Sequence, residues 1–250
     1  MANTFNMHPQ IVNMGEVLGE WTLPFKLYKK TSWLNISLNS YLNTIYSSFI
    51  FFYVAQLFSM ISHIKRKESI RFKFKSNIKT IGIKDFSFLI KEKGLDQWLV
   101  QAEDLKVIYL YRENILKRYL SLAMMNKTGV VKKEDKGKKS SLHVNISDML
   151  RELDVYSQQR TYEESLISRI SANRVIKLRY EDYFCDAETM KKETRRMFDF
   201  LDVDPIELKS KQLKISSDNL SELIENYSEV KGALKGTPYS IYLGVDDEKI

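Results

Sequence analysis

Three short apolar segments, each followed by a stretch with helical periodicity, constrain the fold of this chain more than any other feature. The segments are rich in Val and Ile and comprise Thr80–Phe86, Lys106–Tyr111 and Arg174–Tyr180. Strands separated by helices pair in parallel, because a parallel neighbour is reached only through a crossover connection. The sequence therefore predicts an α/β fold with three layers (α/β/α), in which helices cover both faces of a central parallel sheet.

The helical stretches are recognised by apolar residues at spacings of three and four. Residues 114–129 have one apolar face, with Asn114 as the predicted N-cap and Gly129 as the predicted C-terminal stop. A second long amphipathic helix is predicted after residue 145, with Ser147 or Asp148 placed to cap it.

The length and composition favour one domain over residues 1–250, because 250 residues with 44% apolar content can bury a full core. Two smaller domains are the alternative. The chain has one cysteine, Cys185, which excludes an intrachain disulfide and favours a reducing, cytoplasmic compartment. The first residues lack a basic segment followed by an apolar run, so no secretory signal is predicted.

The segment Ser48–Ile61 is almost entirely apolar and is followed by the basic sequence "HIKRK". A helix that spans a bilayer needs about 20 apolar residues, and this run is shorter and contains Gln56. A buried core helix is therefore favoured over a membrane segment, and no membrane span is predicted.

The net charge of +7 is unevenly distributed, and a lysine-rich loop is predicted at about residues 127–141. Between Lys127 and Lys139 there are six lysines against Glu134 and Asp135. No aromatic residue lies among these lysines to stack on bases, and no nucleic-acid-binding motif occurs, so a nucleic-acid partner is not predicted. A solvated loop is the simpler interpretation. The alternative is a basic rim that attracts an anionic ligand.

The charged residues at the strand ends suggest a binding site. In parallel α/β sheets, ligands bind beyond the carboxyl ends of the strands, where helix N-termini converge. Arg112 follows one strand directly and precedes the helix that Asn114 caps, an arrangement that suits a phosphate group. Ser121 lies about two turns further along and can add a hydroxyl. The alternative is that Arg112 pairs with a surface carboxylate and Ser121 is an ordinary helix residue.

Five segments, in the same order, resemble the bacterial-type sulfotransferases that use 3'-phosphoadenylylsulfate (PAPS). They are "HPQIVNMGEVL", "IGIKDF", "KVIYLYRENILKRYLSLAMMNKTG", "VIKLRYEDYFCDAETMKKETRRMFDFLDVDP" and "LSELIENYSEVKGALKGTPYSIYL". The resemblance extends from His8 to Leu243. It implies the P-loop NTPase-like sulfotransferase fold, PAPS as co-substrate, PAP as product, and no metal ion.

The resemblance implies roles for residues near the nucleotide. Arg112 and Ser121 match the Arg and Ser that hold the 3'-phosphate, and Tyr180 matches the tyrosine near the adenine. Glu181 and Asp182 are expected to hold the strand end and the following turn rather than to contact the ligand.

The resemblance also implies catalytic residues. Lys84 matches a lysine whose ammonium approaches the sulfuryl oxygens, and Glu16 resembles the glutamate proposed as the base in some bacterial members. Many eukaryotic members have a histidine as base where this chain has Phe86. The alternative for Glu16 is a loop carboxylate that pairs with a lysine. His8 precedes Pro9 and is expected to hold a turn.

One element of the family is missing from the sequence. The family begins with a strand and a phosphate loop that binds the 5'-phosphosulfate through backbone N–H groups. No such loop occurs in this chain. A truncated start, a loss of activity, and another way of binding the 5' end all stay open.

The sequence therefore predicts a sulfotransferase that moves a sulfuryl group from PAPS to a hydroxyl of a small molecule or glycan. The alternative is a catalytically impaired PAP/PAPS-binding protein or a truncated family member.

Overall fold

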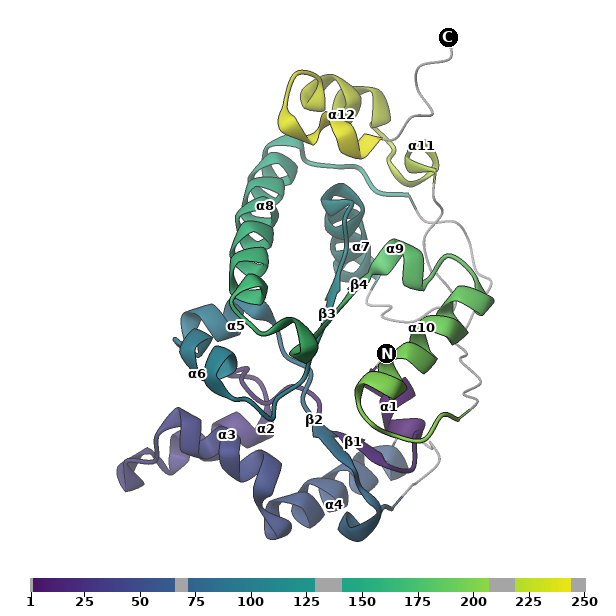
Figure 1. The fold of residues 1–250 in the computed structure, drawn as a ribbon. Helices are drawn as coiled ribbons and strands as arrows, with labels where there is room; N and C mark the ends of the chain where they lie inside the picture. Colours follow the sequence, from purple (N-terminus) through teal and green to yellow (C-terminus); the bar gives the residue numbers. More distant parts are fainter. Residues whose placement is uncertain (1, 66–71, 129–140, 207–218, 244–250) are drawn as a thin grey trace. The chain divides into compact units, whose positions relative to one another are not determined.

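The described residues form a mixed α/β structure in which helices predominate (Figure 1). The computed structural model describes residues 2–65, 72–128, 141–206 and 219–243. The chain divides into two compact units. Unit 1 comprises Met1–Ile108, Ser168–Ile176 and Lys191–Ser210, and unit 2 comprises Tyr109–Ile167, Lys177–Met190 and Lys211–Ile250. That the whole chain is one domain stays a prediction.

The three strands predicted from the sequence are present, and each is shorter than its apolar segment. They are β2 (Thr80–Gly82), β3 (Val107–Tyr111) and β4 (Val175–Arg179), and they are preceded by an unpredicted strand, β1 (Ile11–Asn13). Strand β1 pairs in parallel with β2, with Val12 opposite Ile81. Strands β3 and β4 form a second parallel pair. The α/β class and the parallel pairing are therefore confirmed.

The strands of the described residues form two separate pairs instead of one continuous sheet. A strand in the middle of a three-layer structure is buried on both faces. Strand β3 is only partly buried along its length, and its Leu110 is 37% exposed. The predicted central sheet is therefore not seen in the described parts of the chain.

Unit 1 consists of the β1–β2 pair and mostly short helices. The helices are α1 (Ala2–Met7), α2 (Leu23–Lys30), α3 (Leu38–Ser47), α4 (Phe49–Lys65), α5 (Ser87–Glu92) and α6 (Asp96–Gln101), with the 3-10 helices η1 (Ser32–Leu34), η2 (Lys75–Asn77) and η3 (Ala172–Arg174). Its core contains Val17 and Leu18, which follow β1, and Tyr41 of α3. The Tyr41 hydroxyl donates a hydrogen bond to the carbonyl oxygen of Val17 at 2.8 Å. The loop after β1 is therefore anchored in the core.

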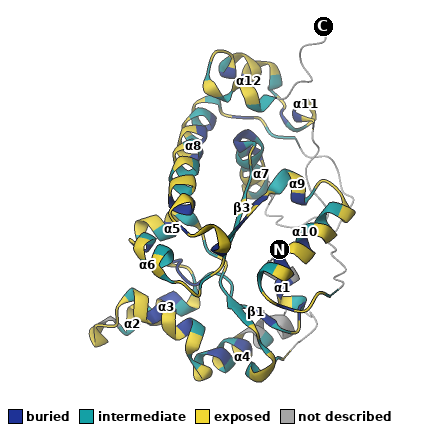
Figure 2. Cartoon of the chain, viewed as in Figure 1, coloured by how far each residue is buried: buried dark blue, intermediate teal, exposed yellow. Residues whose placement is uncertain are grey.

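Unit 2 is built on two long helices, α7 (Ile115–Thr128) and α8 (Ile146–Ser168), which lie side by side in Figure 1. The remaining elements are α9 (Tyr180–Tyr183), α11 (Leu220–Leu223), α12 (Tyr227–Leu234) and η4 (Pro238–Leu243), while α10 (Ala187–Phe200) begins in unit 2 and ends in unit 1. Buried side chains of α7, α8, α11 and α12 form one core, which includes Leu116, Leu153 and Val230. Figure 2 shows buried and exposed residues alternating along α8, as the amphipathic pattern predicts.

The predicted ends of the two long helices are confirmed at one position and wrong at another. Asn114 caps α7, because its Oδ1 accepts a hydrogen bond from the backbone N–H of Lys117 at 2.9 Å. Helix α8 is capped by Asn145, whose Oδ1 accepts from the backbone N–H of Asp148 at 3.1 Å, and not by Ser147 or Asp148. The predicted stop at Gly129 and most of the lysine-rich loop, residues 129–140, lie outside the described residues.

The apolar segment predicted as a buried core helix is helical, but only one of its sides is buried. It forms α4, in which Phe52 and Gln56 are buried while Phe49 and Ile50 are 63% and 75% exposed. Within the parts of the chain that the structure describes, no helix has both the length and the apolar character to cross a membrane.

Candidate functional site

The backbone between β3 and α7 binds a carboxylate. The N–H groups of Glu113 and Asn114 donate to the two carboxylate oxygens of Glu181, at 3.1 and 3.2 Å. Arg112 precedes them, and its Nε lies 3.9 Å from the same carboxylate. Backbone N–H groups at the start of a helix, beside an arginine, favour an anion. In this structure the Glu181 side chain is that anion.

Arg112 also lies against the ring of Tyr180. The guanidinium carbon is 4.7 Å from the ring centroid, within the range of a cation–π interaction. The Arg112 side chain is 13% exposed, so its charge is largely shielded from water. The fold therefore brings together two of the predicted nucleotide-binding residues, Arg112 and Tyr180. The third, Ser121, is exposed on α7, and none of the three is among the residues that line the cavity at this strand end.

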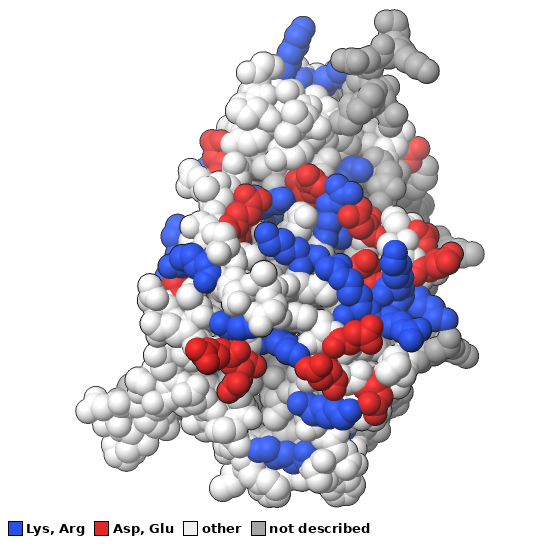
Figure 3. All heavy atoms as spheres, viewed as in Figure 1, with Lys and Arg blue, Asp and Glu red and all other residues white. Residues whose placement is uncertain are grey.

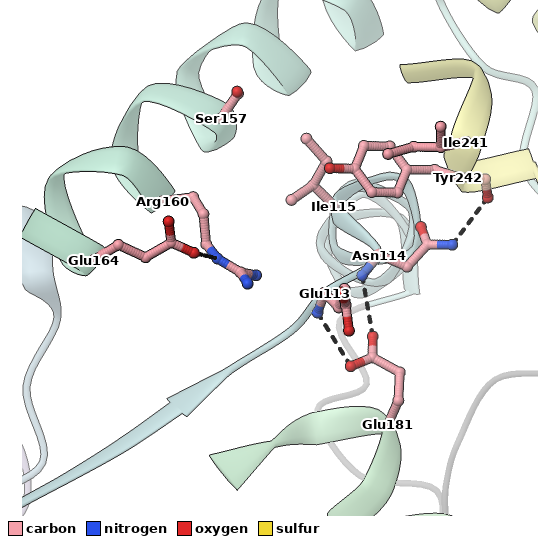
Figure 4. A pocket seen from close by; sticks show the side chains of 9 residues that line it. All are labelled: Glu113, Asn114, Ile115, Ser157, Arg160, Glu164, Glu181, Ile241 and Tyr242. Carbon is pink, nitrogen blue, oxygen red and sulfur yellow. Dashed lines mark hydrogen bonds and ion pairs between the residues drawn. The ribbon is translucent and has the colours of Figure 1, made fainter. Parts of the chain in front are cut away.

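A cavity of about 500 Å³ opens at the start of α7 (Figure 4). It is lined by residues of α7, α8, α9 and η4 and of the turn between β3 and α7, namely Glu113, Asn114, Ile115, Ser157, Arg160, Glu164, Glu181, Ile241 and Tyr242. Figure 4 shows the Arg160 guanidinium next to the Glu164 carboxylate, on the side of the cavity opposite Tyr242. The side-chain amide of Asn114 donates to the carbonyl oxygen of Tyr242 at 2.9 Å, which attaches η4 to the start of α7.

Charged groups at this site are paired in the structure. Arg160 Nε donates to Glu164 at 2.6 Å, and the Arg160 guanidinium carbon lies 4.4 Å from the centroid of Tyr111. Arg179 donates to Glu113 at 2.7 Å and to Asp182 at 2.6 Å. The Arg179 hydrogen bond keeps the pKa of Asp182 below its ordinary value. The N–H groups of Glu113 and Asn114, together with Arg112, form an anion cradle that the Glu181 carboxylate occupies. An incoming anion therefore has to displace Glu181 from this anion cradle.

The two predicted catalytic residues, Glu16 and Lys84, form an ion pair in unit 1. Lys84 Nζ donates to Glu16 Oε1 at 2.7 Å, and the Lys84 ammonium lies 4.6 Å from the ring centroid of Phe86. Gly15 has a φ of +74°, a left-handed conformation that favours glycine, and its carbonyl oxygen accepts from the Lys84 N–H at 2.9 Å. The turn at Gly15 therefore places Glu16 beside Lys84.

Asp85 connects the loops that carry these two residues. Its Oδ2 accepts hydrogen bonds from the backbone N–H groups of Val17 and Leu18, at 2.9 and 3.0 Å. Val17 and Leu18 are fully buried, so these N–H groups cannot reach water. Asp85 therefore positions Glu16 relative to Lys84.

The environment of Glu16 favours its ionised form. Partial burial raises the pKa of Glu16, but the hydrogen bonds from Lys84 and Trp21 outweigh it, so the pKa is lower than its ordinary value. Glu16 is therefore a carboxylate at neutral pH. The contact with Lys84 agrees with the alternative role of Glu16, that of a loop carboxylate that pairs with a lysine.

His8 holds a turn, as predicted from its position before Pro9. Its ring is fully buried, and Nδ1 accepts from the backbone N–H of Gln10 at 3.1 Å. Its Nε2 lies 2.7 Å from the carbonyl oxygen of Asp204. Both ring nitrogens are therefore engaged in structural hydrogen bonds.

Sequence reasoning did not identify Arg160, Glu164 or Tyr242 as residues of the cavity. Arg160 and Glu164 lie on a long amphipathic helix, where charged residues normally face solvent. Tyr242 lies in the last of the segments that carry the resemblance, but no role was assigned to it. Their convergence depends on packing between segments that are far apart in the sequence.

No protein-family model matches this chain, and neither a curated protein nor a solved structure is significantly similar to it. Among the described residues, no group of three or more His, Cys, Asp or Glu side chains is arranged to hold a metal ion.

Proposed function

We propose that this chain transfers a sulfuryl group from PAPS to a hydroxyl group of a small molecule or glycan. The observation that carries the proposal is the anion cradle between β3 and α7, where two backbone N–H groups and Arg112 surround one carboxylate. A phosphate group offers the same kind of oxygen acceptors and a larger charge, so it can replace that carboxylate. The proposal includes the three-layer sulfotransferase fold that the resemblance implies.

The nucleotide part of the proposal rests on Arg112 and Tyr180. Arg112 binds the 3'-phosphate of PAPS, together with the N–H groups of Glu113 and Asn114. Tyr180, which contacts the Arg112 guanidinium, provides a flat apolar face for the adenine. Ser121 is the less supported member of this set, because it is exposed two turns further along α7.

The transfer part of the proposal rests on Glu16 and Lys84. The acceptor oxygen attacks sulfur in line, the bond from sulfur to the 5'-phosphate oxygen breaks, and PAP leaves with the electron pair. Glu16 accepts the hydroxyl proton as an ionised carboxylate, and opening of its ion pair with Lys84 would raise its lowered pKa and make it a stronger base. The Lys84 ammonium stabilises the charge on the sulfuryl oxygens.

A second candidate is a protein that binds PAP or PAPS without transferring the sulfuryl group. One observation favours it: Glu16 and Lys84 neutralise each other at 2.7 Å, so neither is available to a substrate until the pair opens.

Release of PAP from PAPS in the presence of a panel of alcohols and sugars separates the two candidates. The proposed enzyme releases PAP only when an acceptor is present, and Glu16→Gln abolishes the release while PAP still binds. Binding of PAP without release by the native chain supports the second candidate. If calorimetry detects no binding of PAP, both candidates are wrong.

Replacing Arg112 by alanine is expected to weaken PAP binding by about tenfold to a hundredfold, which corresponds to one charge-assisted hydrogen bond. Isothermal titration calorimetry measures the effect. The matched control is Arg151→Ala, because the Arg151 side chain lies on α8 and is 67% exposed. This variant is expected to bind PAP as tightly as the native chain does. Equal affinities for all three proteins would show that Arg112 does not bind the nucleotide.

Replacing Glu181 by glutamine is expected to strengthen PAP binding by about tenfold at low salt, because one like charge is removed from the cradle. The amide oxygen of glutamine can still accept a backbone hydrogen bond, so the fold is retained. The control is Asp182→Asn, because it also removes one negative charge, but from a carboxylate that pairs with Arg179 instead of occupying the anion cradle. A weaker affinity for Glu181→Gln than for Asp182→Asn would contradict displacement of Glu181 by the ligand.

A further inference from the structure

A segment of unit 1 combines strong positive charge with exposed apolar side chains. Residues 21–82 contain ten Lys and Arg residues and one acidic residue, Glu68, so their net charge is +9, whereas that of the whole chain is +7. The same segment holds thirteen of the nineteen large apolar side chains that are exposed among the described residues. The positive charge and the exposed apolar surface of this chain are therefore concentrated in the same segment.

The exposed apolar side chains of α4 lie on one side of the helix. They are between 40% and 75% exposed and comprise Phe49, Ile50, Val54, Leu57 and Phe58. At about 100° per residue, these positions fall within half of the helix circumference. Helix α4 therefore presents a continuous apolar face to its surroundings.

The opposite side of α4 attaches it to unit 1. Phe52 is fully buried, and Gln56 is 7% exposed. The Gln56 side chain donates to the carbonyl oxygen of Lys73 and accepts from its N–H, both at 2.8 Å. The apolar face is therefore held outward by specific contacts and does not result from a loosely attached helix.

Aromatic rings extend the apolar face beyond α4. The ring centroids of Phe49 and Tyr53 are 4.7 Å apart, those of Tyr53 and Phe72 are 5.8 Å apart, and those of Phe72 and Phe74 are 5.5 Å apart. Lys75 Nζ lies 5.9 Å from the ring centroid of Phe49. A basic group therefore borders the aromatic strip directly.

The elements before α4 have the same character. Trp21 and Trp33 are 54% and 76% exposed, and the lysines Lys26 and Lys30 of α2 are exposed as well. Over α3 and α4, the surface drawn in Figure 3 shows uncharged and basic groups and no acidic ones.

We propose that this surface of unit 1 binds to the interface of an anionic lipid membrane. The apolar arc of α4 and the exposed Trp33 enter the boundary between headgroups and acyl chains. The exposed lysines Lys26 and Lys30 contact the anionic headgroups, and each basic residue near such a surface adds attraction. Helix α4 lies in the plane of the membrane, because its 17 residues extend about 25 Å, less than the hydrocarbon thickness.

The charge distribution favours a lipid surface over a second copy of the chain. The described residues of this segment include seven lysines and no acidic residue. Residues outside the segment neutralise two of these lysines, because Glu20 pairs with Lys29 and Asp204 pairs with Lys79, and the others leave an excess of positive charge that two copies would bring together. Like charges oppose self-association, whereas an anionic membrane neutralises them. Apolar contacts alone would fit either a membrane or a second copy of the chain, so the choice of a membrane rests on the positive charge of the segment.

Flotation of the full chain with lipid vesicles tests the proposal. The chain is expected to float with mixed vesicles of phosphatidylcholine and phosphatidylglycerol, and the bound fraction is expected to be about tenfold smaller with pure phosphatidylcholine. Added salt is expected to weaken binding to the mixed vesicles. Tryptophan emission is expected to shift to shorter wavelength on binding, and Trp33→Phe is expected to reduce that shift. If the chain stays with the unbound fraction in both lipid mixtures, the proposal is wrong.

Two sets of variants separate the apolar and the basic contributions. The double variant Ile50→Ser/Leu57→Ser is expected to bind mixed vesicles at least about tenfold more weakly, because two exposed apolar side chains are lost. Lys26→Gln/Lys30→Gln is expected to weaken binding and reduce its salt dependence. Val155→Ser, which alters an exposed apolar residue of α8 in unit 2, is the matched control and is expected to bind normally.

Two results would overturn the proposal even if the chain floats. One is that the Ile50→Ser/Leu57→Ser variant binds vesicles as strongly as the Val155→Ser control. The other is a dimer of the native chain, measured by analytical ultracentrifugation without lipid, that the same double variant abolishes. That dimer would identify a second copy as the partner of this face.

Discussion

Replacing Arg174 by methionine is expected to lower the free energy of unfolding by about 3 kcal/mol or more. The Arg174 side chain donates from Nε, Nη1 and Nη2 to the carbonyl oxygens of Leu105, Val100 and Leu99, at 3.0, 2.8 and 3.0 Å. Arg174 is 9% exposed, so the three carbonyl groups would lose partners that water cannot fully replace. Leu99 and Val100 lie in the last turn of α6, which Arg174 therefore caps.

Urea denaturation followed by circular dichroism measures this effect. Arg174→Lys is expected to be intermediate, because an ammonium group cannot reach three carbonyl oxygens in the fork geometry of a guanidinium. Arg196→Met is the control: Arg196 is half-exposed on α10 and pairs with Glu193, so its loss is expected to cost less than about 0.5 kcal/mol. Similar stabilities for the Arg174→Met and Arg196→Met variants would show that the three hydrogen bonds contribute little.

Replacing Asp85 by alanine is expected to destabilise the chain by about 2 to 4 kcal/mol, because two buried backbone N–H groups lose their acceptor. The groups are those of Val17 and Leu18, in the loop that carries Glu16. Asp85→Asn keeps an acceptor oxygen and is expected to cost less than about 1 kcal/mol. Thermal denaturation of the two variants measures the difference, and equal losses for both would contradict the role of the hydrogen bonds.

The pH dependence of the Asp85→Asn variant gives a further test. Burial raises the pKa of Asp85 in the folded chain, although the N–H groups of Val17 and Leu18 act in the opposite direction. A raised carboxyl pKa contributes stability below the unfolded pKa, and this contribution is lost as the pH rises through the folded value. Asparagine does not titrate. The variant is therefore expected to gain stability relative to the native chain as the pH rises from acid to neutral.

The position of the anion cradle and the alternative that Arg112 pairs with a carboxylate could both be predicted from the sequence, but which carboxylate occupies the cradle could not. A strand that ends at Arg112 before a helix capped by Asn114 is a local pattern, and the structure has both features. That Glu181 fills the cradle depends on the pairing of β3 with β4, which brings residues 68 positions apart into hydrogen-bonding distance. The role expected for Glu181, to hold the strand end, agrees with its hydrogen bonds.

The partners of Arg174 and the buried side of α4 could not be predicted from the sequence. Arg174 reads as a charged residue at the start of a strand, and nothing in its neighbours indicates that three carbonyl groups from residues 99–105 surround it. For α4, the apolar run predicted a helix correctly, but periodicity did not reveal which side is buried, because both sides are apolar.

Three of the four strands, the two long helices and the cap of α7 could be predicted from the sequence alone, because they depend on spacing and composition along the chain. Only the folded structure reveals that the strands of the described residues form two separate pairs, that Glu181 occupies the anion cradle, and that Glu16 is paired with Lys84. Each of these is a contact between residues distant in sequence. Such contacts form only when burial and hydrogen bonding across the whole unit favour one arrangement over its competitors.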